Sequence, residues 1–112
     1  MKIKERIVVE YISPTGKNVF RRWLNSIKDK KTQAVIDSRI LRLRSGNLGV
    51  FKNLGKGLKE LKIDYGAGYR IYFAEEGEDV VVLLAAGDKK SQGGDIKQAY
   101  ENWKNYQEIE ES

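Results

Sequence analysis

Apolar residues recur along three consecutive runs of the chain, residues 61–65, 69–73 and 80–86. In the first two runs every second side chain is apolar, which predicts β-strands with one buried face. The third run is apolar on both faces, a pattern typical of a strand in the middle of a sheet. Gly66 and Gly77 separate the runs and suit short reversals. The pattern therefore predicts an antiparallel meander.

Apolar residues spaced three and four positions apart predict three helices elsewhere in the chain. The first is expected to end near Ser26, and the second to run from about Lys30 to Ser45 with Asp29 as its N-terminal cap. Ser91 is placed to cap the third helix. The predicted apolar faces contain Phe20, Trp23, Leu24 and Ile27 in the first helix, Ile36, Ile40 and Leu43 in the second, and Ile96, Ala99, Tyr100 and Trp103 in the third.

The remaining segments complete a single domain over residues 1–112. Residues 7–12 are expected to form a strand. Residues 13–16 should end this strand and offer N-terminal caps for the first helix. The glycine-rich segment 46–57 lacks the pattern of a nucleotide-binding P-loop and is interpreted as a loop. The acidic tail 107–112 is expected to be frayed. The predicted order is β-α-α-β-β-β-α: an α+β fold, mostly antiparallel, with a helical hairpin packed on one face of the sheet.

Composition limits the chemistry that this chain can perform. It contains no histidine and no cysteine, so acid–base steps are left to Lys, Arg, Tyr, Asp or Glu. We therefore expect no bound metal and no cofactor. Its 112 residues contain neither an apolar run of membrane-spanning length nor the features of a signal peptide, which predicts a cytoplasmic protein without membrane contact.

Charge is distributed unevenly along the chain. Residues 1–50 carry 12 basic and 4 acidic side chains, a net charge of +8, whereas residues 51–100 carry 8 of each. A basic half suits a polyanion such as RNA or DNA. Arg39 and Arg42 on the second predicted helix could follow a phosphate backbone, or they could simply keep that helix soluble.

Three segments together resemble the RelE/ParE superfamily of toxins from bacterial toxin–antitoxin modules. They are RILRLRSGNLG at 39–49, KELKIDYGAGYRIYF at 59–73 and VVVLLAAGDKKSQGGDIKQA at 80–99. The chain looks most similar to the HigB-like branch, called addiction-module killer proteins. This resemblance implies a toxin that cuts mRNA on the ribosome as a metal-independent endoribonuclease. It also implies a cognate antitoxin, expected to be of the helix-turn-helix type.

The resemblance also implies where the site lies. Lys62 matches the basic residue that contacts the scissile region, and Arg70 matches the arginine that holds the phosphate. Lys89 or Lys90 corresponds to the residue that stabilises charge or protonates the leaving group, and the match does not decide between them. The side chains expected to bind RNA are Lys56, Lys59, Tyr72, Arg39 and Arg42.

The residues themselves leave alternatives open. RNA cleavage by its own 2′-hydroxyl needs a proton acceptor, stabilisation of charge on phosphorus and a proton donor, and no histidine is present for the transfers. Lys62 and Arg70, with Glu60 and Asp64 nearby, could instead form an ordinary exposed cross-strand surface, and whether they share a face depends on strand register. The other hypotheses are a gyrase inhibitor of the same fold and a catalytically silent protein that binds an antitoxin or acts as a regulator. The sequence leaves the oligomeric state and the codon preference open.

Overall fold

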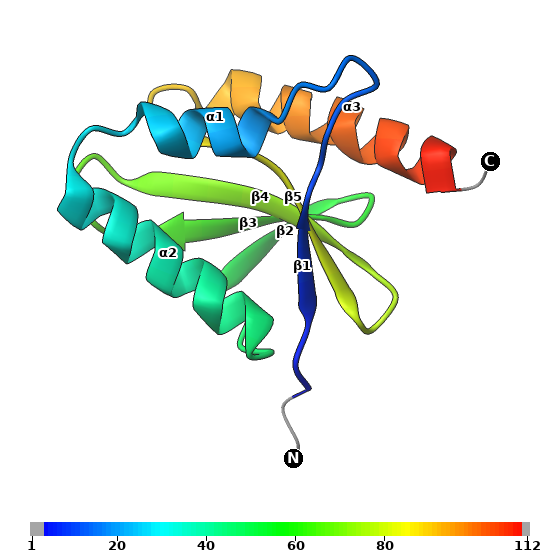
Figure 1. The fold of residues 1–112 in the computed structure, drawn as a ribbon, viewed down its shortest axis with the longest axis horizontal. Helices are drawn as coiled ribbons and strands as arrows, with labels where there is room; N and C mark the ends of the chain where they lie inside the picture. Colours follow the sequence, from blue (N-terminus) through cyan, green and yellow to red (C-terminus); the bar gives the residue numbers. More distant parts are fainter. Residues whose placement is uncertain (1–3, 111–112) are drawn as a thin grey trace.

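The computed structural model describes residues 4–110 and shows an α+β fold, as predicted. A five-stranded sheet lies between two helices on one side and a third helix on the other (Figure 1). In chain order the elements are β1 (Ile7–Glu10), α1 (Val19–Ser26), α2 (Lys30–Arg44), β2 (Phe51–Gly55), β3 (Leu58–Ile63), β4 (Tyr69–Glu76), β5 (Val80–Asp88) and α3 (Gln92–Glu110).

The strands lie in the order β1-β5-β4-β3-β2. Strands β3, β4 and β5 form the predicted antiparallel meander. Strand β5 pairs with β4 on one side and runs parallel to β1 on the other. Its apolar residues are buried on both faces, because helices pack on each side of the sheet. The prediction that this strand occupies the interior of the sheet is confirmed.

Side-chain caps set the start of the first two helices. Asn18 caps α1, because its Oδ1 accepts a hydrogen bond of 2.9 Å from the amide of Arg21. The cap therefore lies after the segment 13–16, which was expected to supply it. Asp29 caps α2 as predicted, accepting from the amide of Lys31 at 3.3 Å.

Each face of the sheet has its own hydrophobic cluster. Helices α1 and α2 cover one face, and α3 covers the other, where Ala99 and Trp103 pack against the sheet. The helical hairpin therefore lies on one face, as predicted. The fully buried side chains between these two helices and the sheet include Phe20, Ile36, Leu43, Leu61, Ile63, Ile71 and Phe73.

Two local predictions are wrong. The segment 46–57, expected to be a loop, contains the edge strand β2, which pairs antiparallel with β3. Strand β2 is held by backbone pairing at the sheet edge, and its exposed pattern gave no buried alternation to detect. Residues 107–110 were expected to be frayed, but α3 continues to Glu110. Tyr106 stacks on Trp103 and donates to Glu76 at 3.1 Å, which holds the last turns of α3; residues 111 and 112 lie outside the described part of the chain.

Candidate functional site

Lys62 of β3 and Arg70 of β4 lie directly opposite each other in the sheet. Glu60 and Tyr72 form the neighbouring opposed pair. Side chains at directly opposed and alternate positions point to the same side of a sheet. All four residues therefore belong to the face that α3 covers, which answers the question of register that the sequence left open.

Arg70 is held inside this face rather than presented at the surface. It is only 7% exposed, and its Nε lies 3.9 Å from Oε2 of Glu60. The same Glu60 oxygen accepts a hydrogen bond of 2.9 Å from Nε2 of Gln92, the first residue of α3. Nε of Arg70 is buried without a hydrogen-bond partner. Glu60 thus stands between the arginine and the start of the helix.

Lys62 has the opposite environment. Its side chain is 56% exposed, and its Nζ lies 4.0 Å from the carboxylate of Asp64. A pair this exposed contributes little to stability, on the order of 0–1 kcal/mol, because water and salt screen it. Lys62 is therefore available to a ligand at the rim of the same face.

The turn that carries Lys89 and Lys90 lies at this end of the sheet, because it directly follows β5, whose Gly87 pairs with Arg70. Both lysines are exposed. Asp88 fixes the turn, since its Oδ1 accepts hydrogen bonds from the amides of Lys90 at 2.9 Å and Ser91 at 3.1 Å. The structure therefore brings Lys62, Arg70 and these lysines to one end of the sheet.

The start of α3 packs tightly against β5 at this end. A side chain at Gly87 would collide with the side-chain ends of Asp95 and Ser91, which would have to move to make room. Asp95 also accepts a hydrogen bond from the hydroxyl of Ser91. Burial raises the pKa of the Asp95 carboxyl; the Ser91 hydrogen bond opposes this rise and the Asp88 carboxylate adds to it.

Tyr72 is fully buried, and its hydroxyl has no hydrogen-bond partner. Burial, followed by the negative charge of Glu60, raises the pKa of this phenol far above its ordinary value. The assignment of Tyr72 to RNA binding does not fit this placement, because the helix above the strand closes its ring to any ligand.

The other residues expected to bind RNA lie away from this end. Lys59 points to the α1–α2 face, where its Nζ lies 5.8 Å from the centre of the Phe51 ring and 3.7 Å from Glu75. Lys56 lies in the turn before β3, at the opposite end of that strand. Arg39 and Arg42 belong to α2, on the far side of the sheet from α3.

Sequence reasoning missed Glu60 and Gln92 as partners of the cluster. Glu60 was considered only as an acidic neighbour of Lys62. Alternation along β3 already placed Glu60 on the face of Lys62. Nothing in the sequence showed that a helix covers this face. Over residues 4–110, no group of three or more acidic side chains is gathered that could hold a metal ion.

Comparison with known proteins changes the family assignment. Residues 22–104 match the model of a family described as phage derived protein Gp49-like. The chain is also 45% identical over 80 residues to an uncharacterized protein of Haemophilus influenzae. The aligned region covers 71% of this chain and 81% of that relative. The resemblance to the RelE/ParE superfamily and its HigB-like branch is therefore corrected, because the family whose model matches is a different one.

Proposed function

This chain belongs to the Gp49-like family of phage-derived proteins, and we propose that it is the toxin of a toxin–antitoxin pair that cleaves mRNA on the ribosome. The toxin-like character of Gp49-like proteins supports the first part of the proposal. The observation that carries the second part is the gathering of Lys62, Arg70 and the Lys89–Lys90 turn at one end of the sheet.

Each basic group has a defined part in this proposal. Lys62 and the two turn lysines are exposed, so they bind the phosphates of the RNA that flank the cleaved bond. Arg70 supplies a forked set of donors suited to the extra charge on phosphorus. To reach the phosphate, its guanidinium must turn away from Glu60, which now lies 3.9 Å from its Nε.

Proton transfer without histidine is the hardest step to supply. We propose that the ribosome holds the mRNA close to the in-line geometry, so that less acid–base catalysis is needed from the protein. The protein then acts in the cytoplasm, where ribosomes and mRNA are its partners. No metal ion or cofactor takes part in this scheme.

Induction of the protein without a partner tests the proposal. We expect growth to stop and a reporter mRNA to be cut within codons, as mapped by primer extension. Lys62→Gln should weaken binding of the RNA and so lower the cleavage rate at low mRNA concentration, because it removes a charge that holds a flanking phosphate. The matched control is Lys31→Gln, because Lys31 is an exposed lysine of α2 on the far side of the sheet. This variant should cleave the mRNA at the wild-type rate.

Other outcomes separate the competing hypotheses. Growth arrest with intact transcripts and altered DNA supercoiling would show a gyrase inhibitor. Normal growth, with the folded protein still binding a co-expressed partner, would show a silent binding protein. Either result would overturn the nuclease proposal.

We also propose that the inhibiting antitoxin has acidic side chains that cover the end of the sheet carrying Lys62, Arg70, Lys89 and Lys90, called here the Lys62–Arg70 end. Its association rate should then fall as salt rises toward about 0.15 M, where the Debye length is about 8 Å. Stopped-flow mixing at several salt concentrations measures this dependence. An association rate that is indifferent to salt would contradict it.

A further inference from the structure

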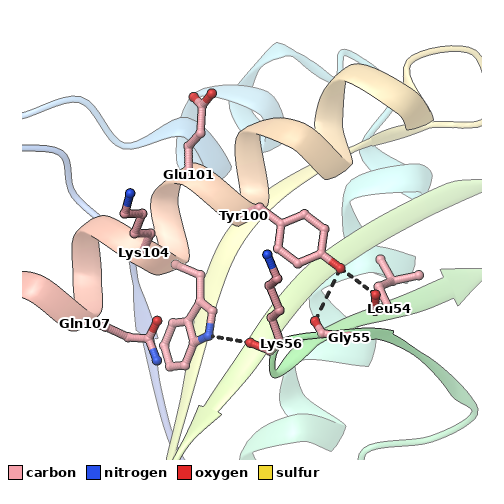
Figure 2. Close-up of a pocket in the computed structure, with 8 residues that line it drawn as sticks. Leu54, Gly55, Lys56, Tyr100, Glu101, Lys104 and Gln107 are labelled. Atoms are coloured by element: carbon pink, nitrogen blue, oxygen red, sulfur yellow. Dashed lines mark hydrogen bonds between the residues drawn. The ribbon is translucent and has the colours of Figure 1, made fainter.

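A second feature of the surface lies at the other end of α3. The C-terminal half of this helix and the Gly55–Gly57 turn between β2 and β3 enclose a groove of about 600 Å³ (Figure 2). Its lining includes Leu54, the rings of Tyr100 and Trp103, and the lysines Lys56 and Lys104. The two ends of β3 lie roughly 16 Å apart, at about 3.3 Å per residue, so this groove is separate from the Lys62–Arg70 end.

The turn at one wall of the groove has an unusual backbone. Lys56 has a φ of +55°, and over residues 4–110 it is the one residue other than glycine with a positive φ. Its neighbours Gly55 and Gly57 also have positive φ, at +99° and +88°. A positive φ at a long side chain persists only where the surroundings hold it.

Helix α3 supplies that support. The Tyr100 hydroxyl donates to the carbonyl of Leu54 at 2.5 Å and lies 3.3 Å from that of Gly55. Nε1 of Trp103 donates to the carbonyl of Lys56 at 3.1 Å. Figure 2 shows the Lys56 side chain extending from this clamped turn into the space between the two aromatic rings. The structure thus holds an ammonium group at the mouth of an apolar groove.

The charges at the rim favour a carboxylate-bearing ligand. Lys56 and Lys104 are exposed, and neither forms an ion pair with another residue of the described chain. Glu101 is the single acidic residue of the lining. A segment with an apolar side chain flanked by carboxylates would match the apolar floor and the two lysines together.

Nucleic acid fits this groove less well. Trp103 is only 7% exposed, and the ring of Tyr106 already stacks on it at 5.8 Å, so its ring cannot serve as a stacking platform for a base. The Tyr100 hydroxyl and Nε1 of Trp103 already donate hydrogen bonds to the carbonyls of Leu54 and Lys56. Stacking platforms for single strands need exposed rings in a positively charged channel.

We propose that this groove is a docking site for a partner protein, which inserts an apolar side chain flanked by acidic residues. The apolar side chain lies against Leu54, Tyr100 and Trp103, and the carboxylates pair with Lys56 and Lys104. The proposal does not rest on nuclease activity. A partner docked here leaves the Lys62–Arg70 end open.

A peptide titration tests the proposal on the full chain. The probe is an acetylated, amidated peptide with a central leucine and two glutamates on each side. ¹H–¹⁵N correlation spectra should show shifts at the indole of Trp103 and at the amides of residues 55–57. Replacing leucine by serine in the probe should weaken binding by at least about tenfold, since burial of a leucine is lost.

Variants of the two lysines test the charge match. Lys56→Gly keeps the positive φ that the turn requires, and Lys104→Gln keeps the length of an exposed helical side chain. Each should weaken binding of the acidic probe by about two- to fivefold, the size of one exposed charge pair. Lys31→Gln on α2 is the matched control and should leave the affinity unchanged.

Three results would overturn the proposal. The first is no shift at Trp103 or at residues 55–57 with millimolar acidic peptide. The second is equal binding of the leucine and serine probes, or of the wild type and both lysine variants. The third is binding of oligouridylate at these resonances in preference to the peptide, which would make the groove part of a nucleic-acid surface.

Discussion

The face of the sheet under α1 and α2 is filled by aliphatic and aromatic side chains, whereas the face under α3 buries Glu60, Arg70, Tyr72 and Asn102. The hydrophobic effect accounts for most of the first face, where the buried hydroxyl of Thr32 donates to Asp29 at 2.8 Å and Lys59 pairs with Glu75. Polar groups on the second face must be paired, since a buried polar group without a partner destabilises the fold.

The α3 face itself divides into two halves. Towards the C-terminus of α3, Asn102 donates to the carbonyl of Leu84 at 2.8 Å, and the side chains of Tyr100 and Trp103 find carbonyl partners. Towards its N-terminus, Nε of Arg70 and the hydroxyl of Tyr72 have none. Unpaired polar atoms therefore lie beside the cluster of basic residues. The contrast is between Tyr100, Asn102 and Trp103 of α3, whose side chains are hydrogen-bonded, and Arg70 and Tyr72 of β4, which each keep an unpaired polar atom; Tyr11 on the same face also has an unpaired hydroxyl.

Breaking the Arg70–Glu60 pair should have the largest effect. Arg70→Met leaves the Glu60 carboxylate buried beside an apolar chain, and removal of one partner of a buried pair destabilises by about 3–5 kcal/mol. Urea unfolding followed by circular dichroism measures the change. The double variant Glu60→Gln/Arg70→Met should recover most of the loss, because no charge remains buried. A single variant as stable as the wild type would show that the pair contributes nothing.

Two tyrosine variants separate the halves of the α3 face. Tyr72→Phe removes an unpaired hydroxyl and should raise the free energy of unfolding by about 1 kcal/mol. Tyr100→Phe removes a hydroxyl bonded to Leu54 and should lower it by about 0.5–1.5 kcal/mol. The same urea titration measures both variants. Equal effects of the two changes would contradict the division.

The charged pair at the rim of the α1–α2 face predicts the smallest effect. Arg21 and Asn18 donate to the Glu10 carboxylate, and the Arg21 hydrogen bond in particular holds the pKa of Glu10 below its ordinary 4.5. The folded protein therefore binds this proton less readily than the unfolded chain, so the stabilisation is present above pH 4.5 and is lost as the pH falls through the lower, folded pKa. For a partly exposed pair it should amount to about 0.2–1 kcal/mol.

Glu10→Gln should remove this pH dependence. Thermal unfolding of the variant and the wild type should differ at pH 7 and converge as the pH falls well below 4.5. A gap between the two melting temperatures that is unchanged across this range would show that Glu10 stabilises by packing alone.

The amino-acid pattern predicted the α+β class, the meander, the second helix with its Asp29 cap and the apolar helix faces. These features depend on residues close together in the chain, where spacing and capping chemistry act locally. Strand β2 was missed because an edge strand held by backbone hydrogen bonds needs no apolar alternation. The pairing of Lys62 with Arg70 was left open because strand register depends on contacts between separate segments.

The sequence by itself determined which residue types this protein can use: a basic chain without histidine or cysteine, with Lys62, Arg70, Lys89 and Lys90 in segments that the fold then joins. Only the tertiary structure decided which of them are exposed. Helix α3 closes over β3 and β4, so that it buries Arg70 against Glu60 and encloses Tyr72, while Lys62 stays at the rim. Burial arises when distant segments pack on one another, and no local pattern records which helix covers a given strand face.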